Sequence, residues 1–333
     1  MDSTTPTPAY HGGNLQEAEV QFGRPAAGWL DLSTGINAEA YPATDIAASS
    51  LQLLPQQSSL DALLAAARHY YRVPEAVAIT AAPGSQSVLQ HLPSIVPTGQ
   101  VAIIGQTYAE HAKTWAEHDH RVAVVENTAD AEAANVTVVV NPNNPDGRLF
   151  RATELIDHAR AKTGAASLLV VDEAFTDTVP EESIVPLLRN ENALVIRSFG
   201  KFFGLPGLRL GFAIGAPDII ANLERRLGPW AVAGPALEIG ARALRDDVWI
   251  DAARKQLTTR CEALDQILQN ADLSVAGGTA LFRFIVDKRA QRLFKHLGEA
   301  GIFTRSFPEQ PTWLRIGIPA SDADLQRLKR ALS

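Results

Sequence analysis

Short apolar runs alternate with amphipathic segments through the middle of the chain. The runs rich in Val, Ile, Leu and Ala that predict buried strands are Ala76–Thr80, Val101–Ile104, Arg121–Val125, Val136–Asn141, Leu168–Asp172, Leu194–Ser198 and Leu210–Ile214. Helical periodicity separates several of these runs, at residues 84–96, 107–118, 152–163 and 217–227. Apolar strands that alternate with helices indicate an α/β fold, in which helices flank a mostly parallel central sheet. Ligands of such folds bind beyond the carboxyl ends of the strands, so the loops after these runs are the candidate site.

The pattern differs at both ends of the chain. Residues 1–36 are rich in Gly, Pro and polar residues, which predicts an extended arm, and residues 58–72 predict a helix that Ser58 can cap. After Pro229 the elements are those of a smaller α+β lobe: a helical pattern at 235–270 with a break near Asp246 and Asp247, strands at Leu281–Val286, Ile302–Arg305 and Trp313–Ile318, and helices at 288–300 and 321–332. We therefore expect an N-terminal arm (1–37) that joins the small domain, a large α/β domain (38–228) and a small C-terminal α+β domain (229–333).

Composition and charge narrow the classes of function. The 333 residues are 46% hydrophobic and 20% charged, as in ordinary globular proteins, and the net charge of −7 argues against a nucleic-acid-binding surface. No apolar run approaches the roughly 20 residues that cross a bilayer, so no membrane association is expected. Cys261 is the one cysteine, which excludes an intramolecular disulfide, and the polar N-terminus lacks the pattern of a secretory signal. These features predict a cytoplasmic protein.

One segment carries the strongest signal for chemistry. Lys201 lies among Phe and Gly residues after the predicted strand, with Ser198 three positions before it and Arg209 eight positions after it. A hydrophobic pocket lowers the pKa of a lysine, and a deprotonated amine forms a Schiff base with a carbonyl. A hydroxyl and a guanidinium are donors that suit a phosphate. Together the three residues predict an attachment site for pyridoxal 5′-phosphate (PLP). The alternative is a solvated lysine at the end of a strand, since most lysines are exposed.

Asp172 ends the apolar run Leu168–Asp172, where a buried carboxylate needs a cation or a donor as its partner. A protonated pyridine nitrogen is such a partner, and keeping that nitrogen protonated makes the PLP ring an electron sink. One predicted strand separates Asp172 from Lys201, so both side chains can reach one cleft. The alternative role for Asp172 is the cap of a helix.

Two loops after other predicted strands are further candidates. Gly84, Ser85 and Gln86 open a helix, and a glycine turn at a helix N-terminus presents N–H groups to a phosphate. The loop Asn141–Gly147 contains Asn-Pro and Asp-Gly pairs, and Tyr108 follows Val101–Ile104 after a short connection. Both loops can also be ordinary tight turns, and Tyr108 can be a packing residue at the start of a helix. His118 and His120 are possible metal ligands, but no third ligand is evident, so no metal site is expected.

The spacing Ser198-x-x-Lys201-x7-Arg209 resembles the lysine segment of the fold-type I PLP enzymes, the aspartate aminotransferase superfamily. The resemblance implies that Gly84, Ser85 and Gln86 hold the PLP phosphate together with Ser198 and Arg209. It also implies that Asn144, in an Asn-Pro-x-Gly motif, bonds the phenolic oxygen of the cofactor and that Tyr108 stacks on its ring. Members of this superfamily are homodimers whose active sites lie at the subunit interface, so the resemblance implies a homodimer here.

Several segments together look like the threonine-phosphate decarboxylase family, which is close kin to histidinol-phosphate aminotransferases. They are His11–Asn14, Ser33–Asn37, Asn141–Gly147, Asp172–Phe175 and Ser198–Lys201. The resemblance implies decarboxylation of L-threonine O-3-phosphate to (R)-1-amino-2-propanol O-2-phosphate in cobalamin biosynthesis. It further implies that this small phosphorylated amino acid contacts His11, Thr34, Gly35, Asn37, Asn144, Arg305 and Arg315. From the residues alone, a lone N-terminal histidine such as His11 is more often solvated, and Arg305 can equally be a surface salt-bridging residue.

Two positions depart from the pattern of related aminotransferases. Phe175 stands where many have a tyrosine that bonds the cofactor oxygen, and Leu53–Gln56 lacks the tyrosine that many send to the phosphate in the partner subunit. Two other functions stay open beside decarboxylation. One is an aminotransferase of the histidinol-phosphate type, and the other is a non-catalytic PLP-fold protein that serves as a partner or sensor. Intact Lys201, Asp172, Asn144 and Arg209 argue against the non-catalytic protein.

Overall fold

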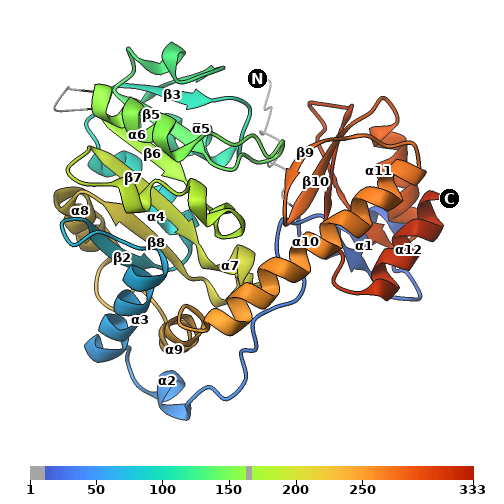
Figure 1. Ribbon diagram of the computed structural model, residues 1–333, viewed down its shortest axis with the longest axis horizontal. Helices are drawn as coiled ribbons and strands as arrows, with labels where there is room; N and C mark the ends of the chain where they lie inside the picture. Colours follow the sequence, from blue (N-terminus) through green and yellow to red (C-terminus); the bar gives the residue numbers. More distant parts are fainter. Residues whose placement is uncertain (1–11, 163–166) are drawn as a thin grey trace, which may run out of the picture. The chain divides into compact units, whose positions relative to one another are not determined.

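A computed structural model describes residues 12–162 and 167–333, so His11 lies outside the described residues. The chain forms two compact units (Figure 1). Ile36–Leu257 make the large unit, and the segment up to Gly35 joins Thr258–Ser333 in the small unit. Each of the two units has its own core.

The large unit contains a seven-stranded sheet whose strands have the order β2-β8-β7-β6-β5-β3-β4. The strands are β2 (Ala78–Ala82), β3 (Gln100–Ile104), β4 (Arg121–Val125), β5 (Val136–Val140), β6 (Leu168–Asp172), β7 (Ala193–Ser198) and β8 (Gly211–Gly215). Neighbouring strands from β4 to β7 are parallel, and β8 is antiparallel to both β7 and β2. The mostly parallel sheet confirms the predicted fold class, and each predicted strand overlaps an observed one.

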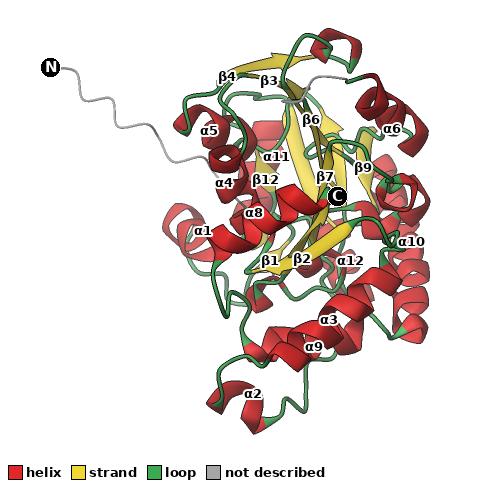
Figure 2. Cartoon of the chain, turned by 90° about the vertical axis from the view of Figure 1, so that its left-hand side faces the viewer, coloured by secondary structure: helices red, strands yellow, loops and turns green. Residues whose placement is uncertain are grey.

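Helices cover the sheet of the large unit on both sides. The helices of the large unit before α10 (Asp247–Asn270) are α2 (Ala48–Gln52), α3 (Gln57–Tyr70), α4 (Ser85–His91), α5 (Glu110–Glu117), α6 (Ala152–Ala161), α7 (Phe199–Phe202), α8 (Pro217–Leu227) and α9 (Gly234–Ala243). Val88 of α4, Trp115 of α5 and Leu223 of α8 pack against the same strand residues, so these three helices share one face. Figure 2 shows α4 and α5 on one side of the strands and α6 on the other. Short 3₁₀ turns lie at Leu92–Ile95, Ala129–Ala131, Thr176–Thr178, Pro180–Glu182, Val185–Leu187 and Pro206–Leu208.

Two predicted helices differ from the observed ones for clear local reasons, and a predicted helix break is confirmed. The helix predicted at 84–96 ends as α4 at His91 and continues as a 3₁₀ turn, because Pro93 cannot donate the N–H of a longer α-helix. The expected cap of α3 is wrong: α3 begins at Gln57, and no side chain caps it. The predicted break near Asp246 is confirmed, since its carboxylate accepts the N–H of Trp249 (3.0 Å) where α10 (Asp247–Asn270) begins.

The compact units divide the chain at different positions from the predicted domains. The prediction placed a border at 228/229, whereas the large unit extends to Leu257 and so includes α9 and the first half of α10. The reason is that α9 packs against α3: a Cβ at Gly240 would lie 2.8 Å from a methyl group of Leu63 and 2.5 Å from one of Leu210. Such close approach requires glycine at this helix contact. The N-terminal border lies at 35/36, so Asn37 belongs to the large unit.

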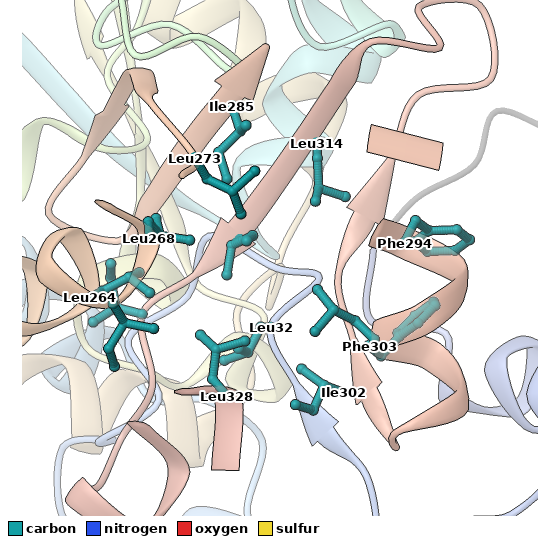
Figure 3. Packing of buried hydrophobic residues seen from close by; sticks show 14 of the residues in the cluster. Leu32, Leu264, Leu268, Leu273, Ile285, Phe294, Ile302, Phe303, Leu314 and Leu328 are labelled. Atoms are coloured by element: carbon teal, nitrogen blue, oxygen red, sulfur yellow. The ribbon is translucent and has the colours of Figure 1, made fainter. Parts of the chain in front are cut away.

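The small unit is an antiparallel sheet with the order β12-β13-β10-β9, beside the parallel pair β1-β11. Its strands are β1 (Leu30–Asp31), β9 (Val275–Thr279), β10 (Phe282–Val286), β11 (Ile302–Phe303), β12 (Arg305–Ser306) and β13 (Trp313–Gly317). The helices α1 (Leu15–Phe22), α11 (Ala290–Glu299) and α12 (Asp322–Leu332) complete it together with the end of α10. Leu32 lies in the same core cluster as Ile302 and Leu328 (Figure 3), so the N-terminal segment is part of this unit's core.

The prediction of an extended arm over residues 1–36 is wrong for residues 15–22, which form α1. Asn14 caps this helix, because its side-chain oxygen accepts the N–H of Glu17 (3.3 Å). The buried Ala18 then faces the core of the small unit. Asn14 therefore has a structural role at the end of the His-Gly-Gly-Asn motif.

Candidate functional site

The strand register of the large unit places the predicted site residues at neighbouring strand ends. Ala82 of β2 and Ser198 of β7 both pair with Gly211 of β8, so the three residues form one row across the sheet. Asp172 of β6 pairs with Val140 of β5 on one side and with Ile196 of β7 on the other. Since β2, β5, β6 and β7 run in the same direction, the loops that carry Gly84, Asn144, Asp172 and Lys201 leave from the same edge. That edge is where open α/β sheets bind ligands.

Gly84 and Arg209 form a cradle that only glycine permits. Gly84 precedes α4 with a φ of +84°, and a Cβ there would lie 2.6 Å from an Nη atom of Arg209. Likewise, a Cβ at Gly211 would lie 2.3 Å from the backbone nitrogen of Ser85. The two glycines thus leave the first N–H groups of α4 close to an exposed guanidinium, which donates to the carbonyl of Pro206 (3.1 Å). Backbone N–H groups and a guanidinium are the donors that a phosphate requires.

The side chain of Gln86 forms hydrogen bonds with two other side chains. Its amide oxygen accepts the hydroxyl of Tyr108 (3.2 Å), and its amide nitrogen donates to a carboxylate oxygen of Glu110 (3.5 Å). Tyr108 also meets the ring of His111 edge-on, with 6.2 Å between the ring centres. These contacts restrain Tyr108 at both its hydroxyl and its ring, as a residue that stacks on a ligand needs.

Asp172 is held from two directions inside the large unit. It is only 7% exposed, one oxygen accepts the N–H of Ala174 (3.0 Å), and the other lies 3.0 Å from Nε2 of His111. The helical turn that follows, Thr176–Thr178, has Phe175 at its N-cap position, so Asp172 does not act as the helix cap that was the alternative. Sequence reasoning missed His111. The available signal was its spacing, since His111 lies three residues after Tyr108 in a helical pattern, on the same face.

Lys201 lies in α7, directly after β7, and is half-buried rather than fully solvated. Its Nζ lies 5.7 Å from the centre of the Phe175 ring, within the range of a cation–π contact. Buried Phe199, Phe202 and Phe203 anchor the helix, and Gly200 lets it approach Pro206, whose Cα would be 2.8 Å from a Cβ there. The local sequence thus fixes the lysine on a short, well-packed helix.

In the loop after β5, two of the three asparagine side chains hold the loop in shape. Asn141 donates to the carbonyl of Phe150 (3.1 Å) and accepts its N–H (2.8 Å). Asn143 donates to the carbonyl of Gln106 (2.9 Å) and to the carboxylate of Asp146 (2.8 Å). Asn144, the next residue, is half-buried. The loop geometry therefore depends on Asn141 and Asn143, and Asn144 remains the predicted ligand of the cofactor.

Asn37 holds the segment that carries Lys201. Its backbone N–H donates to the carbonyl of Lys201 (2.9 Å), and its side-chain amide donates to the carbonyl of Phe202 (3.1 Å). Its side-chain oxygen accepts the N–H of Glu39 (3.1 Å). The observed role of Asn37 is therefore to fix α7, whereas its predicted contact with substrate stays a prediction.

The small unit brings Arg305 and Arg315 together on adjacent strands. The two residues are cross-strand partners between β12 and β13. Arg315 is 3% exposed, donates to the carbonyl of Ser33 (2.9 Å) and lies 4.9 Å from the centre of the Phe282 ring. Burial, and next the charge of Arg305, lower the pKa of Arg315 well below its usual range. A bound anion would offset both costs, so this pair is suited to a phosphate or a carboxylate.

The segment Ser33–Gly35 lies beside this arginine pair. The hydroxyl of Ser33 accepts the N–H of Gly13 (2.7 Å) and donates to Asp31 (2.6 Å). A Cβ at Gly317, two residues after Arg315, would lie 2.7 Å from the carbonyl of Thr34. The small unit thus contains Thr34, Gly35, Arg305 and Arg315, while the predicted cofactor residues belong to the large unit.

Two features are absent from the described part of the chain. Across residues 12–162 and 167–333, no group of three or more His, Cys, Asp or Glu side chains is placed to hold a metal ion. In that same part of the chain, each helix is too short or too polar to cross a bilayer.

Comparison with known proteins gives concordant results. The model of the family "aminotransferase class I and II" matches residues 35–332. A threonine-phosphate decarboxylase of Pseudomonas aeruginosa is 40% identical over 97% of this chain and 96% of its own length. A second, from a Sinorhizobium species, is 40% identical over 98% of both chains.

Solved structures share the fold at lower identity. A histidinol-phosphate aminotransferase from Sinorhizobium meliloti, in complex with pyridoxal-5′-phosphate, has a TM-score of 0.80 and 21% identity over 100% of this chain and 97% of that chain. An L-threonine-O-3-phosphate decarboxylase from Porphyromonas gingivalis has a TM-score of 0.75 and 20% identity over 90% of this chain and 97% of that chain.

Proposed function

The chain belongs to the class I and II aminotransferase family, and we propose that it is a PLP-dependent threonine-phosphate decarboxylase. The reaction would convert L-threonine O-3-phosphate to CO₂ and (R)-1-amino-2-propanol O-2-phosphate in cobalamin biosynthesis. The observation that carries this proposal is 40% identity to two decarboxylases over nearly the whole of both chains. Fold similarity alone does not choose between decarboxylase and aminotransferase, because both are represented among the structural neighbours.

The described residues fit PLP. The phosphate would bind to the first N–H groups of α4 and to the Arg209 guanidinium, which Gly84 and Gly211 let approach each other. Ser198 would add a hydroxyl to this phosphate site, because it pairs with Gly211 in the same row of the sheet. Asp172 would meet the pyridine nitrogen, Asn144 the phenolic oxygen and Tyr108 the ring face, with Gln86 restraining Tyr108. When bound, PLP supplies an aldehyde that condenses with amines and a ring that withdraws electrons.

Two residues would then perform the proton chemistry. The buried carboxylate of Asp172 would hold a proton at the ring nitrogen, since that charge pair offsets the cost of burying the carboxylate. His111 restrains the same carboxylate at its second oxygen. The amine of Lys201 would yield its place to the substrate amine and return a proton to the substrate carbon after CO₂ has left.

Placement of the substrate's two anionic groups decides which bond at Cα breaks. Arg305 and Arg315 are neighbouring cations, and the lowered pKa of Arg315 reports the cost that an anion would relieve. We assign the phosphate and the carboxylate of the substrate to this pair, with His11, Thr34, Gly35 and Asn37 as further polar contacts. Alignment of the carboxylate for cleavage, in place of the Cα hydrogen, is what would make the enzyme a decarboxylase.

A homodimer is part of this proposal. On the large unit, Leu51, Leu53 and Leu54 are each more than half exposed, and Leu54 with Leu53 borders a hollow of about 650 Å³ between α2, α3 and α9. Trp230 is 61% exposed on the loop between α8 and α9. Exposed apolar residues of this size mark interaction surfaces. With one buried, reduced cysteine, Cys261, the protein suits a reducing compartment, and we propose a cytoplasmic location.

Product analysis separates decarboxylation from the alternatives. Purified holoenzyme is incubated with L-threonine O-3-phosphate, and CO₂ is measured. A parallel reaction contains histidinol phosphate and 2-oxoglutarate, and glutamate is measured. The proposal predicts CO₂ in the first reaction and no more than background glutamate in the second. Glutamate without CO₂ would establish an aminotransferase, and neither product, with PLP bound, would favour a non-catalytic protein.

A further inference from the structure

A buried ion cluster lies directly beneath the proposed PLP site, formed by Glu173, Arg197 and Asp177. Glu173 follows Asp172 in the chain, and Arg197 precedes Ser198. Successive side chains on a strand point to opposite faces, so Arg197 of β7 faces away from Ser198. One Nη atom of Arg197 donates to Oε2 of Glu173 (2.6 Å), and the other donates to Asp177. All three side chains are at most 2% exposed.

The cluster is anchored by further groups of the large unit. Glu173 accepts the hydroxyl of Ser183 (2.6 Å) and the backbone N–H of Ile184 (2.8 Å). Burial raises the pKa of Glu173, and Arg197, Ser183 and the Ile184 N–H oppose that rise. The guanidinium of Arg197 lies 4.4 Å from the centre of the Tyr71 ring. The single guanidinium of Arg197 therefore serves both carboxylates, and Ser183 and the Ile184 N–H add donors to Glu173.

Stability alone does not account for such a cluster. Two carboxylates and one guanidinium lose their hydration completely here, and well-packed apolar residues often replace buried ion pairs at no cost in stability. A buried charged network can be retained, despite the free-energy cost of desolvation, where it fixes one arrangement of the backbone among several. The arrangement fixed here is that of the ends of β6 and β7, since Arg197 of β7 bonds the residue that follows β6.

The turn Thr176–Thr178, which contains Asp177, also forms a hydrogen bond to the end of β5. The hydroxyl of Thr176 donates to the carbonyl of Asn141 (2.6 Å), and the N–H of Asn141 donates to the carbonyl of Asp172 (2.9 Å). Hydrogen bonds thus join the ends of β5, β6 and β7. A change in the cluster would be transmitted to these strand ends, and hence to the residues that the proposal assigns to PLP.

We propose that Glu173, Arg197 and Asp177 are positioning residues that hold Asp172 and Ser198 in register for PLP. The inference deepens the proposed function, because it rests on PLP as the ligand of that site. It does not depend on which reaction follows. A protein that binds PLP but releases no CO₂ would contradict the proposed decarboxylase activity and leave this inference intact.

The test uses Glu173→Gln with Glu182→Gln as its matched control. Glu182 is also buried (7% exposed), but its carboxylate accepts the N–H of Ala152 (2.9 Å) and pairs with Arg151 at the start of α6, outside the cluster. The affinity of each apoprotein for PLP is measured by absorbance titration at 25 °C. The pH titration of the bound PLP absorbance and the melting temperature of each apoprotein are recorded as well.

Glu173→Gln is expected to weaken PLP binding about tenfold or more, as the loss of supporting contacts does at other ligand sites, and to shift the pH titration of the absorbance. Glu182→Gln is expected to lower the melting temperature while PLP affinity stays within about twofold of the parent. A folded Glu173→Gln protein with the parental affinity and titration would overturn the inference.

Ser183→Ala provides a second variant in case Glu173→Gln does not fold. It removes one donor to Glu173 without changing a charge and should weaken PLP binding about threefold, by the loss of one supporting hydrogen bond. Parental affinity and parental absorbance titration in Ser183→Ala would contradict the inference by themselves.

Discussion

The side chain at position 175 determines whether a hydroxyl lies near Lys201. Its ring centre lies 5.7 Å from the lysine nitrogen and offers no hydroxyl. Phe175→Tyr would place a donor there, and a donor to the phenolic oxygen of PLP favours its deprotonated form. We predict that the pH midpoint of the bound PLP absorbance falls by about one unit in this variant. A spectrophotometric titration checks this, and an unchanged midpoint would mean that the ring at position 175 does not face the cofactor oxygen.

At the residue scale, the sequence predicts Lys201, Asp172 and Arg209 as ligands of the cofactor, and this assignment stays a prediction. It rests on an amine among apolar residues, a carboxylate at the end of a buried strand and a guanidinium, each of which suits one part of PLP. His111 and Arg197 were not predicted, because their importance lies in contacts with Asp172 and Glu173. Pairings between residues far apart in the chain leave no local pattern.

At the scale of elements, the start of α4 depends on glycine at position 84. A Cβ there would approach the Arg209 guanidinium to 2.6 Å, and the φ of +84° is unfavourable for any other residue. Gly84→Ala should therefore weaken PLP binding about tenfold or more. Gly207→Ala is the matched control, since nothing lies within 4 Å of a Cβ there, and its affinity should stay within about twofold. Equal affinities in the two variants would argue against a phosphate cradle at Gly84.

The turn between β10 and α11 makes the stability of the small unit depend on acid pH. Arg289 lowers the pKa of Asp287 from 3.8 to about 2, by hydrogen bonds from its guanidinium and its backbone N–H. The pKa is lower in the folded state, so Asp287 stabilises the fold above about pH 4, and this contribution disappears as the pH falls towards about 2. We predict that Asp287→Asn lowers the free energy of unfolding by about 1–2 kcal/mol at pH 7.

Urea denaturation of the parent and of Asp287→Asn at several pH values checks this prediction. The difference between the two proteins should shrink as the pH falls below about 4, since protonated Asp287 no longer carries the charge that Arg289 binds. A difference that stays constant down to about pH 2 would show that the charge of Asp287 is not what stabilises the turn.

Elements were predictable where the pattern of apolar residues was dense. The runs of β5, β6 and β7 were found because their Val, Ile and Leu residues are buried on both faces. The strand β9 was missed, because Gly277 and Gly278 leave it without an apolar pattern. Residues 302–305 were predicted as one strand, but β11 pairs with β1 and β12 pairs with β13, a division that depends on partners distant in the chain.

For the whole molecule, the exposed leucines beside α2 bear on assembly. Leu51 and Leu54 are 73% and 60% exposed. If this surface forms the proposed homodimer, the double change Leu51→Glu and Leu54→Glu should yield monomers, because charges at an apolar interface core are strongly unfavourable. Sedimentation equilibrium measures the mass. Val124→Glu is the control, since Val124 is 57% exposed on β4, at the opposite edge of the sheet from β2.

A dimer that survives the double change would exclude this surface, and a monomeric parent would exclude the homodimer. The division of the chain into units belongs to the same scale. It was predicted in outline, with the N-terminal segment joining the C-terminal part, but the border depends on how α9 packs against α3. Helical periodicity shows which face of α9 is apolar and not which neighbour covers it.

The most direct test of the account follows the carboxyl carbon of the substrate. L-Threonine O-3-phosphate labelled at its carboxyl group is incubated with the holoenzyme and with Lys201→Ala, and labelled CO₂ is measured over time. The account predicts steady release by the parent and a loss of about a thousandfold or more in the variant, because the amine of Lys201 both accepts PLP and returns the proton. Equal release of labelled CO₂ by both proteins, or label that remains in a keto acid of the parent reaction, would contradict it.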